Sequence, residues 1–89
     1  MPDLTVNGST EFSGINAGKL AFVDVRGTWD SCNILVQTKA NGTYTTYATN
    51  GTQTANFARE YRIGSEDGLN LQLTSNGANT ALWAQVVEL

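Results

Sequence analysis

Apolar and polar residues alternate along most of this chain in the way that is typical of β-strands. Leu69–Thr74 alternates without a break, and in Ser31–Thr38 the residues Cys32, Ile34 and Val36 fall on one face. No window shows the sustained spacing of an amphipathic helix. The pattern predicts six to eight short strands, in the ranges Leu4–Val6, Thr10–Phe12, Lys19–Val25, Ser31–Thr38, Thr43–Ala48, Gln53–Ile63, Leu69–Thr74 and Ala81–Val87.

Four Asn-Gly dipeptides separate these segments, at residues 7–8, 41–42, 50–51 and 76–77. Asn and Gly both tolerate positive φ, which two-residue hairpin turns require, so this dipeptide is a strong hairpin signal. We expect Asn76-Gly77 to form the last hairpin and the two dipeptides around Thr43–Ala48 to mark an exposed end. Short strands joined by such turns predict an all-β fold, an antiparallel β-sandwich that is Ig-like or jelly-roll-like.

Three segments carry more detailed expectations. Lys19–Val25 is almost entirely apolar in its inner half, which predicts cover on both faces of that strand. Thr43–Ala48 is rich in Thr and Tyr, which indicates an exposed or edge strand. Gln53–Ile63 is expected to be one strand whose inward residues are Ala55, Phe57, Tyr61 and Ile63.

Composition predicts one small domain that spans residues 1–89, with residues 1–13 as a candidate N-terminal arm. The net charge is −3 and the five cations are scattered, which argues against a nucleic-acid partner. No stretch is long and apolar enough for a membrane partner, and no signal peptide is visible. Charged residues make up only 15% of the chain, which favours a surface that a protein partner partly covers.

Few residues are suited to catalysis or metal binding. The chain has no His and one Cys, so Ser-His-Asp or Cys-His sites and a tetrahedral zinc site lack their ligands. Glu66 and Asp67 are expected to lie in a solvated turn, and Cys32 is expected to be a small buried strand residue. We therefore expect no enzyme activity, no cofactor and no metal, and we interpret the Asn-Gly-Ser/Thr triplets as turns and not glycosylation sites.

Four aromatic residues suggest a platform on which a sugar ring would stack, as in carbohydrate-binding modules: Trp29, Trp83, Tyr44 and Tyr47. The alternative is packing, with Trp83 in the core of the last strand and Trp29 closing one end of the sandwich. Tyr44 and Tyr47 are three residues apart, so on an ideal strand they face opposite sides. This spacing favours the packing interpretation.

The segment from residue 27 to residue 87 resembles small β-sandwich structural proteins of tailed bacteriophages, which are capsid decoration (cement) or head-fibre-base proteins. The motifs that carry the resemblance are Gly27-Thr28-Trp29, Asn33–Gln37, Asn41–Tyr44, Arg59–Ile63, Gly68–Leu73 and the turn before the last strand. The chain departs from the family pattern at Gly42–Thr45, which reads Gly-Thr-Tyr-Thr where the family has Gly-Thr-Thr-Trp, and in the penultimate strand, which is Arg-rich in the family and carries Asn70 and Gln72 here.

The resemblance implies a decoration protein that binds the major capsid protein on the exterior of the virion and stabilises the head. It implies synthesis in the bacterial host cytoplasm and assembly as a homotrimer, which would also bury surface for so small a chain. The interaction surface we expect includes the arm and the exposed aromatics, namely Leu4, Phe12, Trp29, Tyr44 and Tyr47.

Three alternatives to a decoration protein differ in kind. The first is a receptor- or carbohydrate-binding module of a head fibre or tail. The second is an Ig-like spacer of a longer protein, against which we note the Met1 start and the lack of linker-like residues at the ends. The third is an enzyme, which the poor inventory of reactive side chains disfavours.

Overall fold

The computed structural model describes residues 3–89, and its secondary structure there consists of β-strands alone. The prediction of an all-β antiparallel sandwich is confirmed. The strands are β1 (Asp3–Leu4), β2 (Gly8–Phe12), β3 (Leu20–Thr28), β4 (Asn33–Ala40), β5 (Thr43–Thr46), β6 (Thr52–Gln53), β7 (Phe57–Arg62), β8 (Leu69–Thr74) and β9 (Ala81–Glu88).

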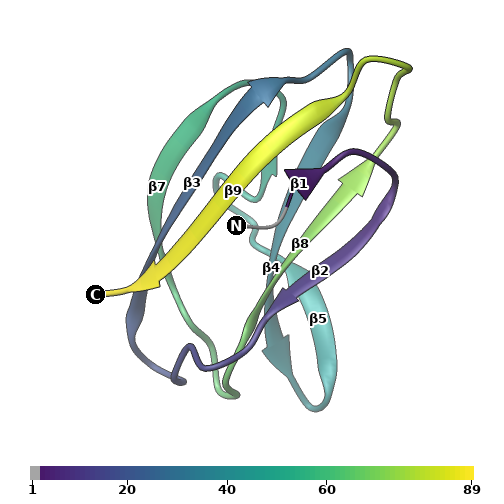
Figure 1. Ribbon diagram of the computed structural model, residues 1–89. Helices are drawn as coiled ribbons and strands as arrows, with labels where there is room; N and C mark the ends of the chain where they lie inside the picture. The colour runs from purple at the N-terminus through teal and green to yellow at the C-terminus, as the bar shows by residue number, and fades with distance from the viewer. Residues whose placement is uncertain (1–2) are drawn as a thin grey trace.

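The strands form two packed sheets (Figure 1), which we call sheet A, with the order β1-β9-β3-β7, and sheet B, with the order β2-β8-β4-β5. The short β6 pairs with β4 beside β5. Apart from β6, the pairing is nested: β1 pairs with β9, β2 with β8, β3 with β7 and β4 with β5. This nesting of eight strands in two sheets is the arrangement of a jelly roll, which decides between the two sandwich types we expected.

The core lies between the two sheets and follows the alternation of the sequence. On β8, the side chains of Leu69, Leu71 and Leu73 point inward and are at most 1% exposed. Alternate residues of the other strands meet them, and half-buried side chains close the ends of the slab. The buried apolar residues are Leu4, Ile15, Ala21, Val23, Val25, Cys32, Ile34, Val36, Phe57, Tyr61, Ile63, Leu69, Leu71, Leu73, Leu82 and Ala84.

Among the four Asn-Gly dipeptides, Asn41-Gly42 forms a two-residue hairpin. Both residues have positive φ, 52° and 75°, and they join the paired ends of β4 and β5. Asn7-Gly8 and Asn76-Gly77 lie where the chain crosses from one sheet to the other, so the expectation of a last hairpin at Asn76-Gly77 is wrong. Asn50-Gly51 leads from β5 into β6, which both pair with β4, so it does not turn neighbouring strands either.

Two further expectations need correction. Gln53–Ile63 is not one strand, because the chain leaves sheet B after β6 and enters sheet A at β7, and Ala55 in between is exposed. Phe57, Tyr61 and Ile63 do point inward. Cys32 is buried as expected, although it lies in the turn before β4 and not within the strand.

The N-terminal segment takes part in both sheets. Its residues 1 and 2 lie outside the described residues, and β1 and β2 pair with β9 and β8 respectively. The described chain measures 36 × 23 × 22 Å. Among the described residues there is no helix with the length and apolar character needed to cross a membrane.

Candidate functional site

The outer face of sheet A carries an apolar and aromatic surface that no other part of the described chain covers. Its side chains alternate with the buried residues of β3 and β9, and they face one another across the two strands. Three cross-strand pairs make up this surface, which we call the Trp83 face, and they are Phe22 with Val87, Asp24 with Gln85 and Arg26 with Trp83.

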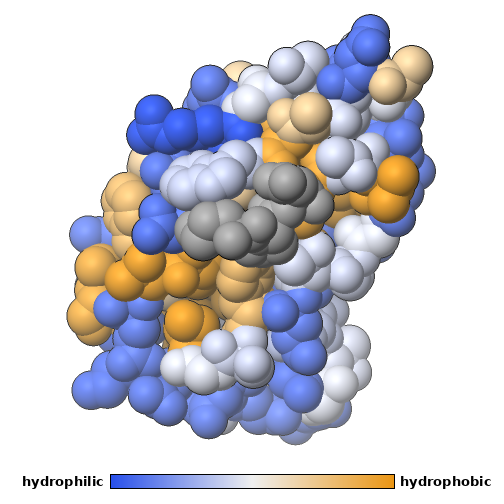
Figure 2. All heavy atoms as spheres, viewed as in Figure 1, coloured by the Kyte–Doolittle hydropathy of each residue, from blue (hydrophilic) through white to orange (hydrophobic). Residues whose placement is uncertain are grey.

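The Trp83 face combines exposed apolar groups with one ion pair. Val87 is 43% exposed and the neighbouring Leu89 is 60% exposed. Arg26 Nε lies 2.8 Å from an Asp24 carboxylate oxygen, and the Arg26 side chain is 63% exposed. Figure 2 shows apolar atoms gathered over the C-terminal half of β9, next to hydrophilic surface. A surface of this kind, apolar and rimmed by polar groups, is typical of protein interaction sites.

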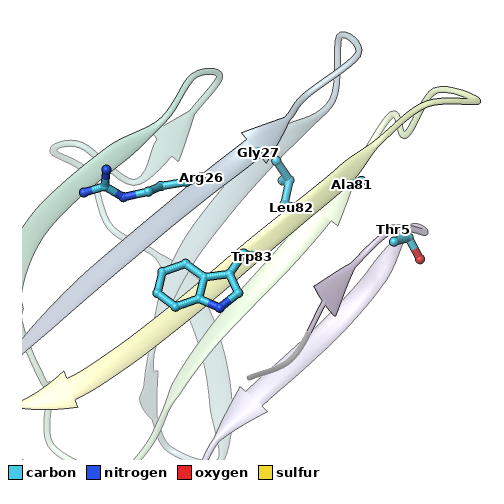
Figure 3. Close-up of a pocket in the computed structure, with 6 residues that line it drawn as sticks. All are labelled: Thr5, Arg26, Gly27, Ala81, Leu82 and Trp83. Atoms are coloured by element: carbon cyan, nitrogen blue, oxygen red, sulfur yellow. The ribbon is translucent and has the colours of Figure 1, made fainter.

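A pocket of about 270 Å³ opens at the end of this face where β3 finishes and β9 begins. Figure 3 shows the residues around it, which come from β3, from β9 and from the turn after β1. Trp83 is the aromatic residue of the lining, and Thr5 and Arg26 are its two residues with polar side chains, of which Arg26 is already paired with Asp24. The complete lining consists of Thr5, Arg26, Gly27, Ala81, Leu82 and Trp83.

Gly27 brings the backbones of β3 and β9 together beside the pocket. Its φ is +140°, and a Cβ built on it would lie 2.2 Å from the carbonyl oxygen of Ala81. Asn56 fixes this end of β3, because its Oδ1 accepts hydrogen bonds from the Gly27 N–H at 3.0 Å and from Trp29 Nε1 at 2.8 Å. The pocket is therefore built on a rigid part of the sheet.

The outer face of sheet B differs from the Trp83 face because its polar side chains bind one another. Asn70 Nδ2 donates to Gln37 Oε1 at 2.7 Å, and Gln37 Nε2 donates to Gln72 Oε1 and to Thr46 Oγ1, each at 3.1 Å. Asn70 is only 3% exposed. Because these side chains already hydrogen-bond to one another, they stabilise the sheet and have few free donors or acceptors for a partner protein.

Tyr44 lies over the end of this polar face. Its hydroxyl donates to Glu11 Oε2 at 2.6 Å, and Lys39 Nζ lies 5.7 Å from the centre of its ring. Burial, followed by the hydrogen bond to Glu11 and the charges of Glu11 and Glu66, raises the pKa of Tyr44 to about 12. The hydroxyl thus stays protonated at neutral pH and links β5 to β2.

The five residues that the sequence suggested for an interaction surface do not form one surface in this structure. Leu4 is 6% exposed and belongs to the core, and Phe12 is half-buried against it. Trp29 packs on Phe57, while Tyr47 packs on Tyr61 with its ring centre 5.0 Å away. Tyr44 and Tyr47 do face opposite sides, as their spacing predicts. It stays a prediction that any of these five residues binds a partner protein.

Sequence reasoning named Trp83 as a possible sugar-stacking residue but favoured a place for it in the core, and left it out of the expected interaction surface. Trp83 is half-buried on the outer face, so its expected place in the core is wrong. The signal was present in Ala81–Val87, because Leu82 and Ala84 alternate with Trp83 and both are buried. Phe22 was missed for a related reason, since the apolar run in β3 suggested cover on both faces and the chain covers only one.

The described residues show little that points to reaction chemistry. Within residues 3–89, no group of three or more His, Cys, Asp or Glu side chains is placed to hold a metal ion. Burial raises the pKa of the Cys32 thiol, which disfavours the reactive thiolate form. In comparisons with known proteins, no family model, no curated protein and no solved structure matches this chain.

Proposed function

We propose that this chain is a non-enzymatic structural protein of a bacteriophage virion, which binds the outer shell of the head and stabilises it. The Trp83 face is the single observation that carries the proposal. An apolar surface on two long paired strands gives a flat, rigid area on which a larger protein can dock. The major capsid protein is the proposed partner, and the choice of partner comes from the family resemblance.

The sequence of β3 also supports a partner on this face. Its run of apolar residues, from Leu20 to Val23, is typical of a strand that is covered on both sides, and the chain supplies cover mainly on the inner side. A docked protein would cover the outer side of β3. The jelly roll is a common fold of viral capsid proteins and of lectins, so it is compatible with the proposal without deciding it. The homotrimer stays a prediction.

Capsid binding is expected to depend on the Trp83 face and not on sheet B. Purified protein should bind empty expanded heads of the phage that carries the gene and raise their melting temperature. Val87→Asp places a charge on an exposed apolar position and should weaken binding about 30-fold or more, the effect of losing a hot-spot residue. Binding curves measured by co-sedimentation, with calorimetry of the heads, test this.

The matched control for capsid binding is Gln72→Ala, which alters the outer face of sheet B. It should bind the heads like the wild-type chain. If the wild type leaves both the sedimentation and the melting temperature of the heads unchanged, the decoration function is wrong. If Val87→Asp and Gln72→Ala bind equally well, the protein docks through a surface other than the Trp83 face.

The pocket beside Trp83 favours one second function, a carbohydrate- or receptor-binding module of a fibre or tail. The half-buried Trp83 lines this pocket together with Arg26 and Thr5, and an aromatic side chain beside polar ones is a common composition of ligand sites. If this is the function, the wild-type chain binds members of a glycan array and Trp83→Ala removes the signal. Tyr44→Phe, an aromatic change on the other sheet, should leave the signal unchanged. A blank array with the wild type would reject this function.

A further inference from the structure

The four Asn-Gly dipeptides share a chemical reactivity that is separate from their use as turns. The backbone nitrogen of the glycine can attack the side-chain amide carbon of the asparagine, because glycine has no side chain to obstruct the approach. Ammonia leaves, and a cyclic succinimide forms that water opens to aspartate or isoaspartate. The reaction needs an asparagine side chain and a peptide group that can turn toward each other, and access to water. The fold meets these needs unequally at the four sites.

The side chains of Asn7 and Asn76 are each held by the backbone of the other residue. Asn7 Oδ1 accepts a hydrogen bond from the Asn76 N–H at 2.9 Å, and Asn76 Oδ1 accepts one from the Asn7 N–H at 3.2 Å. The Gly77 N–H donates to Thr80 Oγ1 at 2.8 Å, and a hydroxyl oxygen is a far weaker base than a carboxylate. Ring closure at either site would have to break these bonds, so the fold protects both asparagines.

Asn50-Gly51 is held through its backbone. The Asn50 carbonyl accepts hydrogen bonds from the Tyr61 hydroxyl at 2.6 Å and from Gln53 Nε2 at 2.8 Å. Gly51 is buried, and its carbonyl accepts a hydrogen bond from the Val36 N–H at 2.6 Å. Ring closure would have to rotate the peptide group between residues 50 and 51 against these bonds. The Asn50 side chain is exposed, but the nitrogen it would react with is fixed.

Asn41-Gly42 lacks these restraints. The dipeptide forms the tip of the β4–β5 hairpin, which projects from the end of sheet B (Figure 1), and both of its residues are exposed. Within residues 3–89, no hydrogen bond holds the Asn41 side chain. A Cβ built on Gly42 would meet nothing within 4 Å, so the turn has room to move and water can reach it.

A carboxylate lies on the nitrogen that must react at this site. The Gly42 N–H donates to Glu66 Oε2 at 2.8 Å, which is within the distance over which a general base takes a proton. Glu66 is half-buried in the loop between β7 and β8, so the fold brings it to the hairpin from a distant part of the chain. In the part of the chain that the structure describes, no other Asn-Gly nitrogen donates to a carboxylate.

We propose that Asn41 is a self-modification site, at which Gly42 and Glu66 convert the asparagine to aspartate and isoaspartate without a second protein. Glu66 takes the Gly42 amide proton as that nitrogen bonds to Asn41 Cγ. The Cγ–Nδ2 bond then breaks, and the proton passes from Glu66 to the departing nitrogen, which leaves as ammonia. Water is the only other reactant. It adds across one of the ring C–N bonds, which restores the Gly42 N–H and leaves a new carboxyl group.

The isoaspartate product is expected to alter the end of sheet B. It routes the main chain through the side chain of residue 41, and so adds a carbon atom between the paired residues Ala40 and Thr43. A two-residue turn joins strand ends that lie directly opposite each other, and a longer connection does not fit this geometry. We therefore expect Thr43 and Tyr44 to lose their pairing with β4. The inference is separate from the proposed function, because the Trp83 face lies on the other sheet.

Peptide mass spectrometry of the purified wild-type chain, incubated in buffer, tests the selectivity among the four sites. Fragment ions assign the change of mass from amide to acid to one asparagine. In the folded chain Asn41 should convert about tenfold faster than Asn7, Asn50 and Asn76, because it alone combines an unrestrained side chain with a base. In a parallel sample unfolded in urea, the four sites should convert at similar rates. Equal rates in the folded chain overturn the proposal, as does faster conversion at another site.

Glu66→Gln tests the base, because its side-chain oxygen can still accept the Gly42 N–H but is no longer a carboxylate. Conversion of Asn41 should slow about tenfold, less than the loss of a base costs in a closed active site. Glu60→Gln is the matched control, since Glu60 is exposed on β7 and the variant loses the same charge. It should convert Asn41 like the wild type.

An unchanged or faster rate in Glu66→Gln overturns the assignment of Glu66 as the base. Urea denaturation of both variants shows whether they are folded, and the comparison of folded with unfolded wild type does not depend on either variant. Because none of these measurements uses capsids, their failure leaves the proposed function standing.

Discussion

Replacing Gly27 with alanine should lower the free energy of unfolding by about 3 to 5 kcal/mol. Two penalties add at this position. The backbone φ of +140° is one that residues with a side chain rarely adopt, and the new methyl group would meet the Ala81 carbonyl oxygen at 2.2 Å. The contact is with backbone on both strands, so no side-chain rotation can relieve it. The paired strands β3 and β9 would have to separate.

Urea denaturation followed by tryptophan fluorescence measures this loss. A domain of this size is stable by about 5 to 13 kcal/mol, so the variant should melt about 12 to 40 °C lower or fail to fold. Gly14→Ala is the matched control, because Gly14 also has positive φ, +81°, but its added methyl group meets nothing within 4 Å. It should cost about 1 kcal/mol. Equal losses in the two variants would show that β3 and β9 are not in close contact at Gly27.

Local turn signals in this sequence identified where the chain reverses but not which strands pair. Asn41 and Gly42 form the one hairpin that the Asn-Gly rule predicted correctly, because β4 and β5 are the innermost pair of the nested arrangement. Outside that pair, most consecutive strands lie in different sheets. A tight reversal with positive φ suits a crossover as well as a hairpin, and the partner is chosen by contacts that are distant in sequence.

The alternation of side chains predicted the core better than it predicted the surface. Ile34, Val36, Leu71 and other alternate residues are buried as expected, because a strand at the core must keep one apolar face inward. The position of Trp83 contradicts a different assumption, namely that the largest apolar side chain of a strand is the buried one. Its small neighbour Ala84 fills the inward position instead.

The two outer faces of the sandwich differ in how far their side chains already have partners within the chain. On sheet B, Gln37 and Asn70 lie in a network of side-chain hydrogen bonds, and Tyr44 extends that network to Glu11. On sheet A, Val87 is exposed and Phe22 and Trp83 are half-buried. The apolar surface that the described chain leaves uncovered thus lies on one side of the molecule, which is the side where we expect partners to bind.

Truncating Leu71 tests the assignment of faces on which these conclusions rest. The side chain is 0% exposed and lies in the middle of β8, opposite Val36 of β4. Leu71→Ala removes buried methyl groups and leaves a cavity between the two sheets, so it should cost about 2 to 5 kcal/mol. The loss is measured as the change in the free energy of unfolding in urea, and a cooperative transition with an unchanged m-value would show that the fold is retained.

Leu35→Ala is the matched control for Leu71→Ala, because it deletes the same atoms from the opposite face of sheet B. Leu35 lies on β4 opposite Gln72, between the buried residues Ile34 and Val36, and is only partly buried. Its truncation leaves no enclosed cavity and should cost about 1 kcal/mol or less. A larger loss for Leu35→Ala than for Leu71→Ala would reverse the two faces of sheet B.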